Sequence, residues 1–197
     1  MKRAEIEFWD ELHLNSLTKT EPYNFYTDLA RQPDRISRVL DVGCGNGRNT
    51  LPFLAGAEEV VAVDPSEVGL AILRRHAGDQ KNLRIIKSTA ESFNWQDEYF
   101  DLVICHGVLH LIPQNEQKDV ISKLQKMTRQ RGLNVIVAIS GTHGKTTKVK
   151  HPLYLSDLSS LRDTYLSWKC KLIEEYTTLS SAEFPYPRQF YRAIWER

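Results

Sequence analysis

Short apolar runs alternate along the chain with longer stretches whose apolar residues recur at helical spacing. Five runs rich in Val, Ile and Leu have the length of buried strands and lie at 39–42, 60–63, 83–87, 100–105 and 133–139. Residues 66–76 and 114–128 carry apolar side chains along one helical face, and Gln130-Arg131-Gly132 is expected to form a turn. Strands that alternate with helices in this way predict βαβ units and a parallel sheet.

The N-terminal part of the chain carries helical patterns. Residues 5–12 predict an amphipathic helix. The sequence Thr-Glu-Pro-Tyr at 20–23 is typical of a helix start, and it leads into a second helix that runs to Ala30. We expect residues 1–34 to form a helical lid on a core of residues 35–197.

The C-terminal part departs from the alternation. Residues 157–166 look helical, whereas 169–176 and 190–195 are strand-like runs joined without a helix. Because a short non-helical connection joins antiparallel strands, this tail predicts a hairpin at the sheet edge. The expected fold is α/β: a Rossmann-like, doubly wound, mostly parallel seven-stranded sheet with a C-terminal antiparallel hairpin.

Composition fits one globular domain spanning 1–197. The chain has 197 residues, of which 41% are hydrophobic, and its net charge of +1 gives no electrostatic reason to expect nucleic acid or membrane partners. No apolar run reaches transmembrane length, and the charged N-terminus lacks a signal-peptide core. Cys44, Cys105 and Cys170 are far apart and have no His at ligand spacing, so we expect a reducing cytoplasm and no metal site.

A glycine loop follows the first strand. Asp41 ends the apolar run, and Gly43, Gly45 and Gly47 follow at alternate positions before a helix expected to start at 49–51. Glycines here let the backbone pass close to a ligand, because no Cβ intrudes. The dinucleotide fingerprint G-x-G-x-x-G spaces its third glycine differently and binds a pyrophosphate. An acid two residues before the first glycine argues against a phosphate and for a ligand that carries an ammonium group.

The motif D-x-G-x-G-x-G at 41–47 resembles motif I of the class I S-adenosyl-L-methionine (SAM) methyltransferases, whose ligand has an amino-acid end and no phosphate. The expected sheet with its C-terminal hairpin is similar to the architecture of that family. The run Cys-Gly-Asn-Gly-Arg-Asn-Thr-Leu at 44–51, together with Phe-Trp-Asp at 8–10, resembles the TehB-like (tellurite-resistance-type) group. This resemblance implies SAM as the cofactor and a small molecule as the acceptor.

The resemblance also implies cofactor contacts after the second and third strands. Asp64 stands where a doubly wound fold places an acid that accepts hydrogen bonds from ribose hydroxyls; alternatively, it caps the helix that follows Pro65. Thr-Ala-Glu at 89–91 is expected to meet the adenine, although the family often has Asp where Thr89 stands. Phe93 and Trp95 either cover the adenine or belong to the core.

The fourth strand resembles motif IV and ends at Cys105 and His106, which should lie beside the methionine part of SAM. Either His106 or His110 is a candidate general base near neutral pH. The alternative is that His106 contributes only backbone and His110 packs under the following helix. Trp9, with Tyr23 and Tyr26, either offers an aromatic face to the sulfonium or packs the N-terminal helices onto the sheet. The expected cofactor-binding residues are Asp41, Gly43, Cys44, Gly45, Gly47, Asp64, Pro65, Thr89, Ala90, Glu91, Cys105, His106 and Trp9.

The expected function is transfer of a methyl group from SAM to a small-molecule acceptor by in-line displacement. No nucleic acid or membrane partner is expected, and the chain is expected to be a monomer or a homodimer. One alternative is a SAM-binding protein without catalysis. Another is nucleotide binding through Gly-Thr-His-Gly-Lys-Thr-Thr at 141–147, which resembles the phosphate loop of Mur ligases. Because Pro152 follows too soon for a helix that would bind phosphate, a substrate-side loop is favoured there.

Overall fold

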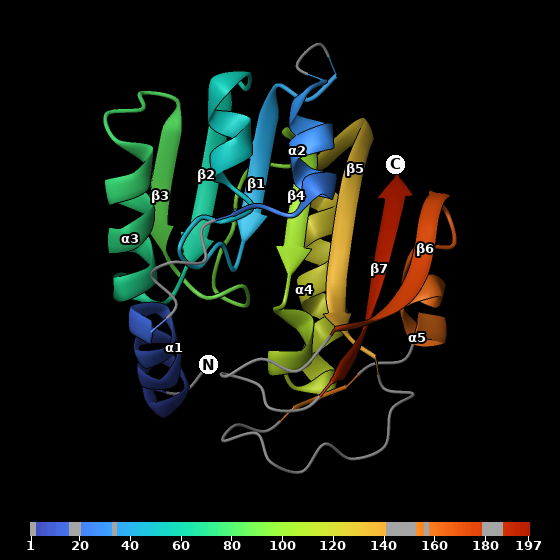
Figure 1. Cartoon of the computed structure of the whole chain (residues 1–197). Coiled ribbons are helices and arrows are strands. Elements are labelled where there is room, and N and C mark those ends of the chain that lie inside the picture. Colours follow the sequence, from blue (N-terminus) through green and yellow to red (C-terminus); the bar gives the residue numbers. More distant parts are fainter. Residues whose placement is uncertain (1–2, 16–20, 33–34, 141–152, 156–157, 179–186) are drawn as a thin grey trace.

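A computed structural model describes residues 3–15, 21–32, 35–140, 153–155, 158–178 and 187–197. Within these ranges the chain forms one seven-stranded sheet with the order β3-β2-β1-β4-β5-β7-β6 (Figure 1). The strands are β1 (Arg38–Val42), β2 (Glu59–Asp64), β3 (Leu83–Lys87), β4 (Phe100–His106), β5 (Thr128–Ile139), β6 (Lys169–Thr178) and β7 (Arg188–Glu196). The first five are parallel, and β7 runs antiparallel to both β5 and β6. The predicted sheet and its C-terminal hairpin are therefore confirmed.

Helices cover both faces of the sheet (Figure 1). The helical elements are α1 (Arg3–Asn15), α2 (Asn24–Ala30), η1 (Leu51–Ala55), α3 (Glu67–Ala77), η2 (Leu109–Leu111), α4 (Gln114–Met127) and α5 (Leu158–Thr164). One core cluster joins the sheet to α2, η1 and α3, and the other joins it to α4 and α5. None of the helices in the described ranges is long and apolar enough to cross a membrane.

Local chemistry explains where the two longest core-covering helices lie. α3 starts at Ser66, whose hydroxyl accepts a hydrogen bond from the Gly69 amide at 2.9 Å, and it ends before Gly78, whose φ is 63°. α4 buries Val120 and Leu124 on one face, together with other apolar residues at helical spacing, as the sequence predicts.

Two local expectations differ from the structure. The helix expected after the glycine loop is only the short 3₁₀ segment η1, because Pro52 opens it and Gly56 ends it. The turn expected at 130–132 is part of β5, where Arg131 has a φ of 66° and the pairing with β4 shifts register. The backbone amide of Arg131 donates to the Arg197 carbonyl at 2.9 Å, so this irregular part of β5 pairs with the chain end. The expected capping residue Thr20 lies outside the described residues, so that expectation stays a prediction; α2 starts at Asn24, with Tyr23 at the N-cap position and no side-chain cap hydrogen bond.

Candidate active site

The sheet has a switch point between β1 and β4. The chain builds β2 and β3 on one side of β1, and then β4 and β5 on the other. Val42, near the end of β1, pairs with Val63 of β2 and with Cys105 of β4, so the carboxyl ends of these strands lie level. Ligands of open α/β sheets bind outside the carboxyl ends at such a point. The predicted site residues after β1, β2 and β4 therefore lie at one edge.

The glycine loop lies at this switch point. Gly43, Gly45 and Gly47 have φ values of 75°, 54° and 85°, which side chains rarely tolerate. A Cβ on Gly43 would lie 2.1 Å from a methyl carbon of Val108, and one on Gly47 would lie 2.3 Å from a methyl carbon of Leu73. The backbone amides of Gly43 and Cys44 donate to the Val63 carbonyl, which fastens the loop to β2. The loop is thus a close-packed backbone turn.

Asp41 is a buried carboxylate beside this loop. Among the described residues its one hydrogen bond comes from the Thr50 hydroxyl, at 2.6 Å. Burial raises the pKa of Asp41 to about 7; the bond from Thr50 acts in the opposite direction, and the nearby charge of Asp64 raises it further. Its environment therefore favours a cation as a further partner.

Asp64 connects the loop to α3. Its Oδ2 accepts from the Gly45 amide and its Oδ1 from the Ser66 amide, both at 2.8 Å. Burial raises the pKa of Asp64 to about 6, against the effect of these two hydrogen bonds. The N-cap of α3 is Ser66, so Asp64 precedes the helix and does not cap it. Its two hydrogen bonds leave further lone pairs on both oxygens, because each carboxylate oxygen has two. Pro65 is partly buried between Asp64 and the start of α3.

The segment after β3 lies at the neighbouring strand end. The Thr89 hydroxyl is used locally, because it bonds to Ser92 at 3.3 Å. Ala90 packs against the core, and the backbone carbonyl of Glu91 accepts from the Lys123 ammonium at 2.5 Å. Phe93 and Trp95 pack with Tyr99 and Phe100 at the amino end of β4, so these two rings belong to the core.

Helix α1 packs on α3 and on the glycine loop. The Ser66 hydroxyl donates to Asp10 at 2.5 Å. The His13 ring lies against the loop, since a Cβ on Gly45 would come within 2.8 Å of its Cε1. Burial lowers the pKa of His13, although Asp10 acts in the opposite direction. Trp9 contacts Phe8 and His13, and it is absent from the lining of the pocket described next.

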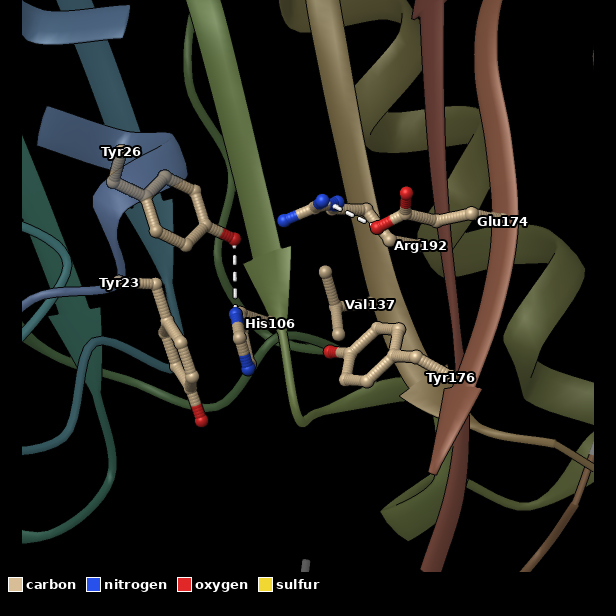
Figure 2. A pocket seen from close by; sticks show the side chains of 7 residues that line it. All are labelled: Tyr23, Tyr26, His106, Val137, Glu174, Tyr176 and Arg192. Carbon is tan, nitrogen blue, oxygen red and sulfur yellow. Dashed lines mark hydrogen bonds and ion pairs between the residues drawn. The ribbon is translucent and has the colours of Figure 1, made fainter. Parts of the chain in front are cut away.

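A pocket of about 280 Å³ lies beside the end of β4. Figure 2 shows its lining, which consists of Tyr23, Tyr26, His106, Val137, Glu174, Tyr176 and Arg192.

His106 forms the wall between this pocket and α2. The Tyr26 hydroxyl is 2.9 Å from His106 Nδ1, and the Tyr23 ring stacks on the imidazole with centroids 5.1 Å apart. The Arg48 guanidinium lies 4.0 Å above the Tyr23 ring, which links the glycine loop to the pocket. Burial lowers the pKa of His106 to about 3, and the charges of Arg48 and Arg192 lower it further. His106 is thus neutral at physiological pH.

His110 and Cys105 are buried near His106 but do not line the pocket. The Ile139 amide donates to His110 Nδ1 at 3.3 Å, and Phe190 meets the ring edge-on. Burial lowers the pKa of His110 to about 3 and raises the pKa of the Cys105 thiol to about 12. His110 therefore packs against β5 and β7, and not under the following helix.

Sequence reasoning missed the side of the pocket that the C-terminal hairpin supplies. Glu174 and Tyr176 alternate on one face of β6, and Arg192 of β7 pairs in register with Glu174. The period-two spacing of Glu174 and Tyr176 is visible in the sequence. Their position opposite His106 depends on β7 lying between β5 and β6. The loop contacts of Asp10, His13 and Thr50 were also missed.

Known proteins share both the sequence pattern and the fold. A family described as "Methyltransferase domain" matches residues 39–132. An uncharacterized methyltransferase, YcgJ of Bacillus subtilis, is 26% identical over 66% of this chain and 52% of its own length. A probable SAM-dependent methyltransferase, TehB of Haemophilus influenzae, is 28% identical over 67% of this chain and 46% of its own length. The chain thus spans about half the length of the relatives it matches.

Solved structures agree on the fold. TehB of Haemophilus influenzae has a TM-score of 0.72 at 21% identity, with 89% of this chain and 62% of that chain covered. The N-methyltransferase NodS of Bradyrhizobium japonicum, solved with S-adenosylhomocysteine (SAH), has a TM-score of 0.69 at 12% identity, with 96% and 98% covered. By its glycine loop, its strand order and these similarities, the chain resembles the class I, SAM-dependent methyltransferases, TehB among them, and residues 39–132 match their methyltransferase domain.

Proposed function

We propose that this chain transfers a methyl group from SAM to a small-molecule acceptor held in the pocket beside His106. The observation that carries the proposal is Asp41, a buried carboxylate next to the glycine loop with no cation against it among the described residues. A buried charge of this kind favours an oppositely charged partner, and the ammonium group of an amino-acid ligand supplies one. A phosphate would add a second negative charge.

The residues at the strand ends fit SAM in three respects. The glycines let the backbone turn tightly at the ends of β1 and β2, Asp41 matches an ammonium group, and Asp64 keeps lone pairs for ribose hydroxyls. The segment at 89–91 would face the adenine, mainly through its backbone. The residues proposed to hold SAM are Asp41, Gly43, Cys44, Gly45, Gly47, Asp64, Pro65, Thr89, Ala90, Glu91, Cys105 and His106, with Trp9 from the N-terminal helix.

Bound SAM supplies a methyl group on a positively charged sulfur, which leaves as a neutral thioether and needs no acid. The main task of the chain is then to hold the acceptor in line, and such positioning contributes ~7–11 kcal/mol in favourable cases. A pKa near 3 makes His106 a weak base at neutral pH. We therefore propose that His106, held by Tyr26, orients an acceptor that reacts in its deprotonated form. His110, whose Nδ1 serves the Ile139 amide, has a structural role in this scheme.

We further propose that residues 1–34 act as a lid. Support comes from the contacts of Asp10 with Ser66 and of His13 with the surroundings of Gly45, because both lie at the cofactor edge. Tyr23, at the start of α2, stacks on His106 and belongs to the same segment. Movement of this segment would open the cofactor edge and the pocket together.

The test begins with the melting temperature of the full chain in the presence of SAH, NAD or Mg-ATP, because a ligand that binds only the folded state raises it. We expect a shift with SAH and none with the other two. Incubation with labelled SAM and a panel of small acceptors then measures transfer. A shift with Mg-ATP alone would contradict the proposal and implicate the segment 141–147, which lies outside the described residues. SAH binding without transfer to any acceptor would favour a SAM-binding protein without catalysis.

A further inference from the structure

Polar groups from opposite walls of the pocket point toward its centre (Figure 2). The Tyr26 hydroxyl and the His106 imidazole come from α2 and the end of β4, and the Tyr176 hydroxyl and the Arg192 guanidinium come from β6 and β7. These elements are far apart in the sequence. The pocket therefore presents a set of groups that the fold assembles around one ligand.

Donors outnumber acceptors among these groups at neutral pH, although Tyr26 and His106 use one donor in the hydrogen bond between them. Burial raises the pKa of Tyr26 well above its usual value and that of Tyr176 to about 12, so both hydroxyls keep their protons. A guanidinium has five N–H donors and no acceptor. A ligand that satisfies this set must itself be rich in acceptor atoms.

Arg192 is held in place but only partly paired. Its guanidinium forms an ion pair with Glu174, which lies opposite it in the β6–β7 ladder, and stacks 4.4 Å from the Phe25 ring. Its Nε is buried without a hydrogen-bond partner in the described part of the chain. One carboxylate therefore leaves donors of this fixed cation for a ligand.

Within the lining Arg192 and Glu174 carry opposite charges, and the second cation near the pocket, Arg48, lies outside the lining as the buried Asp41 does. Arg48 and Arg192 both act on His106, and Glu174 is the one acidic residue in the lining that the structure describes. The donors that the ion pair leaves on Arg192 favour an anion over a neutral or cationic group.

The size and walls of the pocket restrict the rest of the ligand. A pocket of about 280 Å³ has room for a compound with a single ring. The rings of Tyr23, Tyr26 and Tyr176 line it, and Tyr176 is braced by stacking on Phe190 at 5.9 Å. Aromatic walls of this kind pack well against a flat ring.

We infer that the methyl acceptor is a single-ring aromatic compound carrying an anionic oxygen group, such as a carboxylate, which binds Arg192 while the ring packs between the tyrosines. This inference rests on the proposed function, since it names the acceptor class for the same pocket. Glu174 then has a second role: it holds the guanidinium and competes with the acceptor for it.

The test measures binding of benzoate, benzamide and benzylamine to the SAH-saturated full chain by titration calorimetry. The three probes share the ring and differ in charge. We expect benzoate to bind at least tenfold more tightly than benzamide, and benzylamine to bind most weakly. Arg192→Gln should reduce benzoate binding to the level of benzamide, whereas Glu174→Gln should strengthen it. Arg31→Gln, on an exposed arginine of the same charge after α2, should change nothing.

The outcomes separate this inference from the function on which it rests. If SAH does not bind, the proposed function fails. If SAH binds but benzoate is no better than benzamide, or benzylamine is preferred, the acceptor class is wrong and the proposed function stands. Stronger benzoate binding to Glu174→Gln cannot arise from loss of folding, so this variant keeps the test decisive if Arg192→Gln is unstable.

Discussion

Replacement of Asp41 by Asn should stabilise the protein without ligand and weaken its binding of SAH. The carboxylate is buried, and its pKa rises from 3.8 to about 7 on folding. A difference of roughly 3 units at 1.36 kcal/mol each corresponds to about 4 kcal/mol as an upper limit. Because Asn can still accept the hydrogen bond from Thr50, we expect Asp41→Asn to gain roughly 2–4 kcal/mol at pH 8, or roughly 4–16 °C in melting temperature.

The sign of the pH dependence follows from the same shift. Between pH 4 and 7 the unfolded chain ionises Asp41 while the folded chain keeps it protonated, so the cost of burying the charge grows as the pH rises through this window. Asp41→Asn has no such cost. The stability difference between the two proteins should therefore vanish below about pH 4 and be complete above about pH 7.

Binding should respond in the opposite direction. A hydrogen bond to a charged group contributes ~1.5–3 kcal/mol, so loss of the carboxylate should weaken SAH binding by roughly ten- to a hundredfold. Urea unfolding of the ligand-free protein across the pH range measures the first effect, and calorimetric titration with SAH measures the second. Asp28→Asn is a matched control, because it makes the same chemical change at an exposed position on α2. A variant that is no more stable at pH 8, or that binds SAH as tightly as the original chain, would refute the reasoning.

Three further predictions concern the loop, the strand end and the core. Gly47→Ala should lower the free energy of unfolding by roughly 2–5 kcal/mol in urea, since it adds left-handed backbone strain to a clash with Leu73. Gly78→Ala, at a position with positive φ and open space, should cost only ~1–2 kcal/mol. Equal losses would show that the clash is unimportant. Asp64→Asn should reduce SAH affinity at least severalfold by calorimetry with little change in melting temperature, and unchanged affinity would remove Asp64 from the cofactor site. His110→Phe should cost ~1–3 kcal/mol at pH 8 by leaving the Ile139 amide unpaired. That loss should shrink as the pH falls from 6.5 toward 3, because in this range His110 is protonated only in the unfolded chain, which lowers the stability of the original protein and not that of the variant. A constant difference across this range would argue against the buried neutral ring.

Much of the fold was predictable because its signals are local. A run of Val, Ile and Leu between polar segments defines each parallel strand, and β3 begins and ends where the pattern predicts. Asp41 and the three glycines were found for the same reason, since left-handed backbone and an absent Cβ demand glycine at those positions. The stretch 130–132 was expected to be a turn, whereas it is an irregular part of β5 whose backbone pairs with the distant chain end at Arg197.

Residue patterns along the chain are enough to predict the strand–loop–helix units and the chemistry of the glycine loop. Tertiary structure decided which of two similar histidines faces a pocket: His106 meets Tyr26 and Tyr23, whereas His110, four residues later, is buried against Ile139 and Phe190. The position of Arg192 opposite His106 is also a tertiary feature, because it depends on β7 lying between β5 and β6. Backbone steric limits and the spacing of apolar residues involve only a few neighbouring residues, so they can be read from the sequence. Contacts across the sheet depend on strand order and register, and these exist only once the whole chain has folded.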